Sequence, residues 1–254
     1  MKLKHQFVRY SFVTAVVAST LFSLPVAAAA FSSYDVNLVG SASVLGNGDL
    51  QLTNDFGQAG AAWVTSPLST ANSFSATFSF SLQTLNFIPM ADGVALVLQN
   101  QGTNNVVGSG GGDIGYTGLN GVGSIIQTWD NNKTGLNTDG NASNTKSAPT
   151  NLGAANLVMG TETVTYNALT HVLAMNGTLN VDGTLYSVSD NANIDLISQF
   201  GPSMYIGFTG GTGLSEADQR ITSFNVAPVP IPAAIWLFGS ALTGLVTLGR
   251  RKSR

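Results

Sequence analysis

The stretch Phe74-Ser75-Ala76-Thr77-Phe78-Ser79-Phe80-Ser81-Leu82 alternates apolar and small polar side chains without a break. Because successive side chains of a β-strand point to opposite faces, this period of two predicts a strand with one buried and one solvated face. Shorter segments predict further strands at Asp49–Thr53, Val94–Leu98, Ser124–Trp129, Glu162–Tyr166, Val172–Met175, Thr184–Val188, Tyr205–Thr209 and Thr222–Val226. Many strands with no helical stripe between them predict an all-β, antiparallel sandwich.

One of these strands and several of the connections between them show further sequence patterns. Val94–Leu98 is apolar throughout, which is typical of a strand covered on both faces. The glycine-rich Gly108–Gly112 and the polar run Asn131–Asn151 predict long loops, which in a compact domain usually carry function or are disordered. Dipeptides that tolerate positive φ predict tight turns at Asn47-Gly48, Asn176-Gly177 and Asp182-Gly183.

The N-terminal segment has the features of a secretory signal peptide. Lys2, Lys4 and Arg9 form a basic region, Phe12–Leu24 is apolar, and Ala27–Ala30 offers small residues for cleavage. A signal peptide over residues 1–30 is excluded from the fold. It predicts an exported protein that signal peptidase processes.

The C-terminal segment combines a short motif, Val229-Pro230-Ile231-Pro232-Ala233, with the apolar run Ala234–Leu248 and the basic cluster Arg250-Arg251-Lys252. This order resembles the PEP-CTERM class of bacterial sorting tails in its VPLPA-like form, which implies processing by the membrane protease exosortase. Residues 228–254 would then be a sorting tail whose hydrophobic helix holds the protein transiently in the inner membrane, with the arginines cytoplasmic. A plain C-terminal transmembrane anchor is the alternative, although the apolar run is short for a span of roughly 17–25 residues.

The composition of the middle region excludes several classes of function. Residues 31–227 hold all thirteen acidic residues of the chain and three basic ones, a net charge of about −10. This balance argues against a nucleic-acid partner, because phosphate binding needs clustered Lys and Arg. The chain has no cysteine, which excludes disulfides, thiol nucleophiles and cysteine metal sites. A serine-histidine triad would need His171, which lies in a run that predicts a turn entering a strand.

The middle region also carries several landmarks in a fixed order. They are Leu38–Ala42, Gly48–Thr53, Ala62–Pro67, the alternating strand from Phe74, Ala91–Ala95, Gly110–Gly112 with Ile114–Tyr116, Ile126–Asn131, Tyr205–Thr209 and Gly211–Leu214. In this order and spacing they resemble the L-type, legume-like lectin family over nearly all of Phe31–Val226. The resemblance implies that residues 31–227 form a concanavalin-like jelly roll that binds sugar in loops at one edge of a concave sheet.

The resemblance also implies a set of sugar-binding residues. They are Asp92, Gly111, Gly112, Trp129, Asn131, Thr212, Gly213 and Leu214. Asp92 would accept hydrogen bonds from two hydroxyls, after a peptide bond that family members hold in the cis form. Gly111 or Gly112 would offer a backbone N–H that no side chain covers. Alternatively, Asp92 is an ordinary turn residue, Trp129 belongs to the core, and the glycine run is a disordered loop.

A metal site is the point at which the sequence departs from the family. The resemblance implies calcium ligands at Gln127, the Trp129 carbonyl, Asn131 and Asp139. The family has a carboxylate where this chain has Gln127, and a neutral amide offers less charge to offset the dehydration of the ion. Asp130 is a possible compensating acid. The sequence therefore leaves calcium open as a cofactor and predicts no second metal.

Three functions fit these observations. The first is non-catalytic carbohydrate binding by an exported protein of the cell surface or matrix, directed at exopolysaccharide. The second is a structural or adhesive matrix protein that has lost sugar binding. The third is a glycoside hydrolase, which needs two carboxylates flanking the scissile bond. Glu162 and Glu216 are the glutamates of the chain, and neither has an acid two residues before it, which disfavours the hydrolase.

Overall fold

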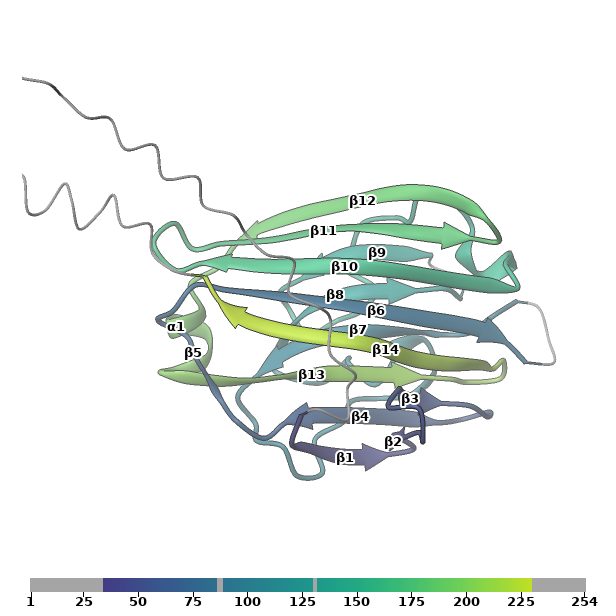
Figure 1. Ribbon diagram of the computed structural model, residues 1–254, viewed down its shortest axis with the longest axis horizontal. Coiled ribbons are helices and arrows are strands. Elements are labelled where there is room, and N and C mark those ends of the chain that lie inside the picture. The colour runs from purple at the N-terminus through teal and green to yellow at the C-terminus, as the bar shows by residue number, and fades with distance from the viewer. Residues whose placement is uncertain (1–33, 86–88, 130–131, 230–254) are drawn as a thin grey trace, which may run out of the picture.

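The computed structural model describes residues 34–85, 89–129 and 132–229, which form two antiparallel sheets packed face to face (Figure 1). One, here the β7 sheet, has the order β1 (Val36–Gly40), β4 (Ala59–Val64), β13 (Ser203–Gly211), β7 (Gly93–Gln99), β8 (Gly121–Gln127) and β9 (Lys133–Asn137), with β5 (Leu68–Ser69) pairing with β13. The other, the β6 sheet, has the order β12 (Thr184–Asn193), β11 (Val172–Val181), β10 (Leu157–Asn167), β6 (Phe74–Thr84), β14 (Ala217–Pro228), β3 (Leu50–Thr53) and β2 (Ser43–Val44). The predicted all-β antiparallel sandwich is confirmed.

The alternating stretch forms β6, at the centre of its sheet. Its apolar side chains are buried and its serines and threonines face outward. Phe78 contacts Phe208 of β13 with ring centroids 5.2 Å apart, and Phe208 contacts Phe224 edge-on at 5.1 Å. Such tilted aromatic pairs are favoured over stacked ones, and they fix the two sheets against each other.

β7 is buried along its whole length, as its apolar sequence predicts. One face contributes to the core between the sheets, and the other packs under the connection between β7 and β8. Ile114 and Tyr116 of this connection join Trp63 in a second apolar cluster on the outer face of the β7 sheet. The Trp63 indole donates a 2.7 Å hydrogen bond to the carbonyl of Val106 in the same connection. This long connection is therefore part of the packed domain, and it carries η2 (Gly111–Asp113).

Two of the three predicted tight turns are present. Gly48, with φ of 89°, lies between β2 and β3, and Asp182 and Gly183 have positive φ in the β11–β12 hairpin. The prediction at Asn176-Gly177 is wrong, because both residues lie inside β11. Gly177 pairs with Glu162, and a Cβ on Gly177 would lie 2.7 Å from the Glu162 Cγ. The glycine makes room for a neighbouring side chain and does not turn the chain.

The prediction of a loop throughout Asn131–Asn151 is also wrong in part, because β9 lies within it. β9 pairs with β8, and the segment after it runs back alongside, with the Thr134 amide donating to the Lys146 carbonyl at 2.9 Å.

His171 lies in the turn between β10 and β11, as expected. No helix among the described residues has the length and apolar character that a membrane crossing requires. The predicted signal peptide, residues 1–30, lies outside the described residues, and so does the predicted sorting tail after residue 229.

Candidate functional site

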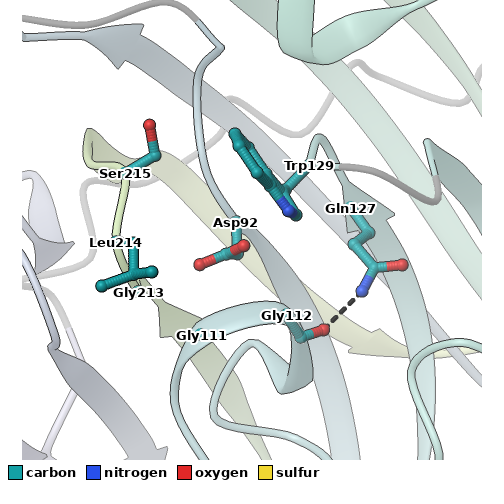
Figure 2. A pocket seen from close by; sticks show the side chains of 8 residues that line it. All are labelled: Asp92, Gly111, Gly112, Gln127, Trp129, Gly213, Leu214 and Ser215. Carbon is teal, nitrogen blue, oxygen red and sulfur yellow. Dashed lines mark hydrogen bonds between the residues drawn. The ribbon is translucent and has the colours of Figure 1, made fainter.

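A cavity of about 350 Å³ opens where β7 begins and β8 and β13 end. Four segments that are distant in sequence meet there, and they contribute the lining residues Asp92, Gly111, Gly112, Gln127, Trp129, Gly213, Leu214 and Ser215. Figure 2 shows the Asp92 carboxylate between the loop that carries Gly213, the glycine turn and the Trp129 ring. The structure thus brings together six of the eight predicted sugar-binding residues, namely Asp92, Gly111, Gly112, Trp129, Gly213 and Leu214.

Hydrogen bonds to both neighbouring strands position Asp92. Its amide donates to the Gly211 carbonyl at the end of β13 at 3.0 Å, and its carbonyl accepts from the Thr128 amide after β8 at 2.8 Å. The Ala91–Asp92 peptide bond is cis, as the resemblance implies. The buried Gln219 side chain donates to the carbonyls of Ala91 and Gly211 at 3.1 and 2.9 Å. These hydrogen bonds hold Asp92 in place at the residue before β7 begins.

The Asp92 carboxyl is poorly solvated. The residue is 4% exposed, and its Oδ2 has no hydrogen-bond partner within the described part of the chain. Burial raises the pKa of Asp92 to about 6, the nearby Gly213 N–H lowers it, and the negative charge of Asp113 raises it again. An acceptor oxygen with no donor, set in a cavity, suits a ligand that brings hydroxyl groups.

Bare backbone forms the wall opposite the tryptophan. Gly111 has φ of 61°, which favours glycine, and its amide donates to the Thr212 carbonyl at 3.0 Å. A Cβ on Gly213 would lie 3.3 Å from the Asp92 Oδ2 and 3.4 Å from the Gly111 Cα. Side chains at these positions would fill the space beside the carboxylate. The predicted glycine loop is therefore an ordered part of the cavity.

The resemblance implies a backbone contact from Thr212, but Thr212 does not line the cavity, and its side chain bonds to residues of the connection between β3 and β4. The Thr212 hydroxyl donates to the Asp55 carbonyl at 2.6 Å and accepts from the Gln58 amide at 2.9 Å. The Gly57 amide donates to the Gly213 carbonyl at 3.0 Å. Thr212 thus fastens the loop after β13 to the connection between β3 and β4.

The rim of the cavity is apolar. Leu214 is fully exposed at the tip of its loop, and Trp129 is 37% exposed, which excludes it from the core.

Ser215 also lines the cavity, and its hydroxyl donates to the Pro89 carbonyl at 2.7 Å. No sequence pattern marks Ser215, because its position follows from a contact between segments more than a hundred residues apart.

The structure does not assemble the predicted calcium ligands. Gln127 is buried, its Nε2 donates to the Gly112 carbonyl, and its Oε1 has no hydrogen-bond partner among the residues that are described. In the β8–β9 ladder Gln127 pairs with Lys133, whereas Asn137 pairs with Gly123. Asp139 follows Asn137 and therefore lies at the opposite end of the hairpin.

Asp139 has other partners at that end. Its carboxylate accepts from the side chains of Asn137 and Asn144, each at 2.7 Å, and the Asn144 bond is the main reason that its pKa is lowered. Asn131 and Asp130 lie outside the described residues, so the structure does not place them. Of the predicted set, Gln127 and Trp129 are adjacent and Asp139 is remote.

The described part of the cavity also lacks the pair of carboxylates that a hydrolase would need. Among the described residues, Asp92 is the one acidic residue that lines it. Glu162 is fully buried between the sheets, where it accepts a 2.8 Å hydrogen bond from the Ser124 hydroxyl. Glu216 is also buried and does not line the cavity. The Asp92 carboxylate can accept hydrogen bonds from hydroxyl groups, and the Trp129 ring can contact an apolar face of a ligand.

Comparisons with known proteins agree with the fold. The legume lectin domain model matches residues 26–231. A lectin from Bauhinia forficata, solved in complex with GalNAc, is 24% identical with a TM-score of 0.64, and the match covers 77% of this chain and 93% of that one. Lectin II from Ulex europaeus is 20% identical with a TM-score of 0.65 over 77% and 93% of the two chains. Arcelin-5, a lectin-like defence protein from Phaseolus vulgaris, is 18% identical with a TM-score of 0.65 over 78% and 94%.

Proposed function

The chain belongs to the legume lectin domain family, and from that premise we propose that it binds carbohydrate without catalysis in the cavity around Asp92. Members of this family generally bind carbohydrate and are not enzymes. The observation that carries the proposal is the Asp92 Oδ2, a buried acceptor that has no hydrogen-bond partner among the described residues and faces a cavity of about 350 Å³. A sugar hydroxyl supplies the missing donor.

Each wall of the cavity has a role in this proposal. Asp92 accepts from the hydroxyls of a hexose, and the Trp129 ring packs on its C–H face. The Gly111 amide already bonds to Thr212, so Gly112 becomes the backbone donor of the glycine turn. Leu214, fully exposed at the rim, adds an apolar contact.

A glycan array tests this function, with Asp92→Asn as the variant. The substitution keeps the shape of the side chain and replaces one acceptor oxygen with a donor, so bound glycans should be lost while the fold is kept. Asp195→Asn is the matched control, because Asp195 caps α1 (Leu196–Phe200) and asparagine caps equally well. Binding that survives in Asp92→Asn would reject the cavity as the sugar site.

Export and surface attachment complete the proposal. A signal peptide over residues 1–30 and a PEP-CTERM-like tail over 228–254 support an exported bacterial protein that exosortase sorts. The domain of residues 31–227 would then meet exopolysaccharide outside the cell. Mass spectrometry of the protein from its native host tests this part, since the mature chain should begin near Phe31 and lack the apolar tail. An intact precursor as the final form would refute it.

A structural matrix protein without sugar binding is the second candidate. The presence of Gln127 in place of a family carboxylate favours it. The glycan array separates the two, because a purely structural protein binds no glycan at any pH or metal concentration.

Legume lectins generally bind calcium and manganese, but the described residues of this chain do not fit calcium. They offer the unpartnered Gln127 Oε1 and the Trp129 carbonyl, while Asp139 lies at the far end of the hairpin. No three His, Cys, Asp or Glu residues gather in the described part of the chain. Calcium prefers six to eight oxygen ligands that include carboxylates. The proposed binding step therefore uses no metal.

A further inference from the structure

The Gln127 side chain joins the end of β8 to the glycine turn. Its Nε2 donates to the Gly112 carbonyl, as the dashed line in Figure 2 shows. The chemistry fixes the orientation of the amide, because the reversed amide would place two acceptor oxygens against each other. The residue is 1% exposed, so little water competes for this hydrogen bond.

This contact holds the glycine turn from one side. On the other side, the Gly111 amide donates to the Thr212 carbonyl at 3.0 Å. The turn is therefore fastened both to β8 and to the loop after β13, with Asp92 between the two. Because the connection from β7 to β8 is long, ordering it costs conformational entropy that such contacts must offset.

The hydrogen bond from Gln127 to Gly112 bears on the calcium site that the family resemblance implies, because Gln127 stands where the family has a carboxylate ligand. A calcium ion requires its oxygen ligands at about 2.3–2.6 Å. The nitrogen of Gln127 cannot be one of them, and Asn137, two residues before Asp139, already lies four ladder positions away, or roughly 13 Å along the strand. A hydrogen bond from a neutral amide takes the place of a metal bridge.

We propose that Gln127 is a positioning residue that orders the glycine turn over the cavity, and that this chain binds its ligand independently of calcium. The inference rests on the proposed sugar site, but its first test does not need a sugar.

The first test measures thermal unfolding of the full chain in EDTA and in millimolar calcium chloride. An ion that binds only the native state raises Tm by mass action. Tm should agree within about 2 °C between the two conditions, and a larger calcium-dependent rise would overturn the proposal.

The second test compares Gln127→Glu with Gln199→Glu by hydrogen–deuterium exchange. Gln199 lies in α1 at the opposite end of the sandwich, so the control makes the same chemical change away from the cavity (Figure 1). Amides of residues 108–116 should exchange at least about tenfold faster in Gln127→Glu and remain unchanged in Gln199→Glu, because only the first variant loses the donor to Gly112.

A third variant and the glycan array complete the experiment. Gln127→Met removes the donor without adding charge and serves if Gln127→Glu does not fold. Wild-type exchange rates in a folded Gln127 variant would overturn the positioning role. Loss of array binding by the wild type in EDTA alone would overturn the independence from calcium. A wild type that binds no glycan in either EDTA or calcium rejects the proposed function, while the thermal and exchange tests still decide on metal independence and on Gln127.

Discussion

Gly177 of β11 lies directly opposite Glu162 of β10, and a Cβ on Gly177 would lie 2.7 Å from the Glu162 Cγ and 2.8 Å from the Thr161 carbonyl oxygen. The missing side chain creates the space in which a buried carboxyl sits between the sheets. Glycine inside a strand weakens it, and a close neighbour is a recognised reason for its presence.

We therefore expect Gly177→Ala to destabilise the fold by about 1–3 kcal/mol, the usual cost of overpacking a core. Urea unfolding measures it. Gly46→Ala is the matched control, because a Cβ at Gly46 meets no atom within 4 Å. Equal stabilities for the two variants would contradict the steric explanation.

The buried Glu162 predicts an unusual pH dependence of stability. Burial raises its pKa to about 7, against the smaller lowering effect of the Ser124 hydrogen bond. Because the folded pKa lies above the unfolded one, the native state holds this proton more tightly. The contribution of Glu162 to stability is therefore fully present below about pH 4.5 and is lost as pH rises through 7.

Glu162→Gln removes this dependence. We expect the wild type to lose up to about 3 kcal/mol of stability between pH 4.5 and 8 through this group, from the cost of 1.36 kcal/mol per pKa unit. The variant should lose less over the same range. Free energies of unfolding at the two pH values, measured for both proteins, test this, and parallel curves would refute it.

The sequence predicted the strands whose pattern is local. The alternation in β6 and the apolar run in β7 each reflect burial of that segment alone. Gly177 was misread because its role depends on Glu162, which reaches it only through strand pairing. β9 was missed because Lys133–Asn137 is largely polar and is ordered by β8 and by the segment after it.

The candidate site could likewise be predicted only in part. That Asp92, the glycine turn, Trp129 and Gly213 meet in one cavity was predictable, because the resemblance covered each of their loops. The roles of Ser215 and Gln127 could not be predicted, since each depends on a hydrogen-bond partner in another loop.

Asp113 should tune the pH dependence of ligand binding. Its charge contributes to the raised pKa of Asp92, after the larger effect of burial. The proposed ligand needs the ionised acceptor, so affinity should fall as pH drops through about 6. Asp113→Asn removes the like charge and should move the midpoint to lower pH. Binding of an array-positive glycan from pH 4.5 to 8 measures both midpoints, and an unchanged or higher midpoint in the variant would exclude this coupling.

Thr212 offers a test of how the loop is held. Its hydroxyl makes two hydrogen bonds, to the Asp55 carbonyl and from the Gln58 amide, and the residue is 1% exposed. Thr212→Val keeps the shape of the side chain and removes both hydrogen bonds of the buried hydroxyl, which should cost about 0.5–1.5 kcal/mol per hydrogen bond. Because the fastened loop carries Gly213 and Leu214, glycan affinity should fall together with stability.

Thr212→Ser is the control, since it retains the hydroxyl and loses only a methyl group. Serine should keep most of the affinity, and valine should lose it even at temperatures well below its Tm. If valine binds as tightly as serine there, the backbone hydrogen bonds of the loop to Gln58, Gly57 and Gly111 are enough to hold it, and the Thr212 side chain has no part in shaping the cavity.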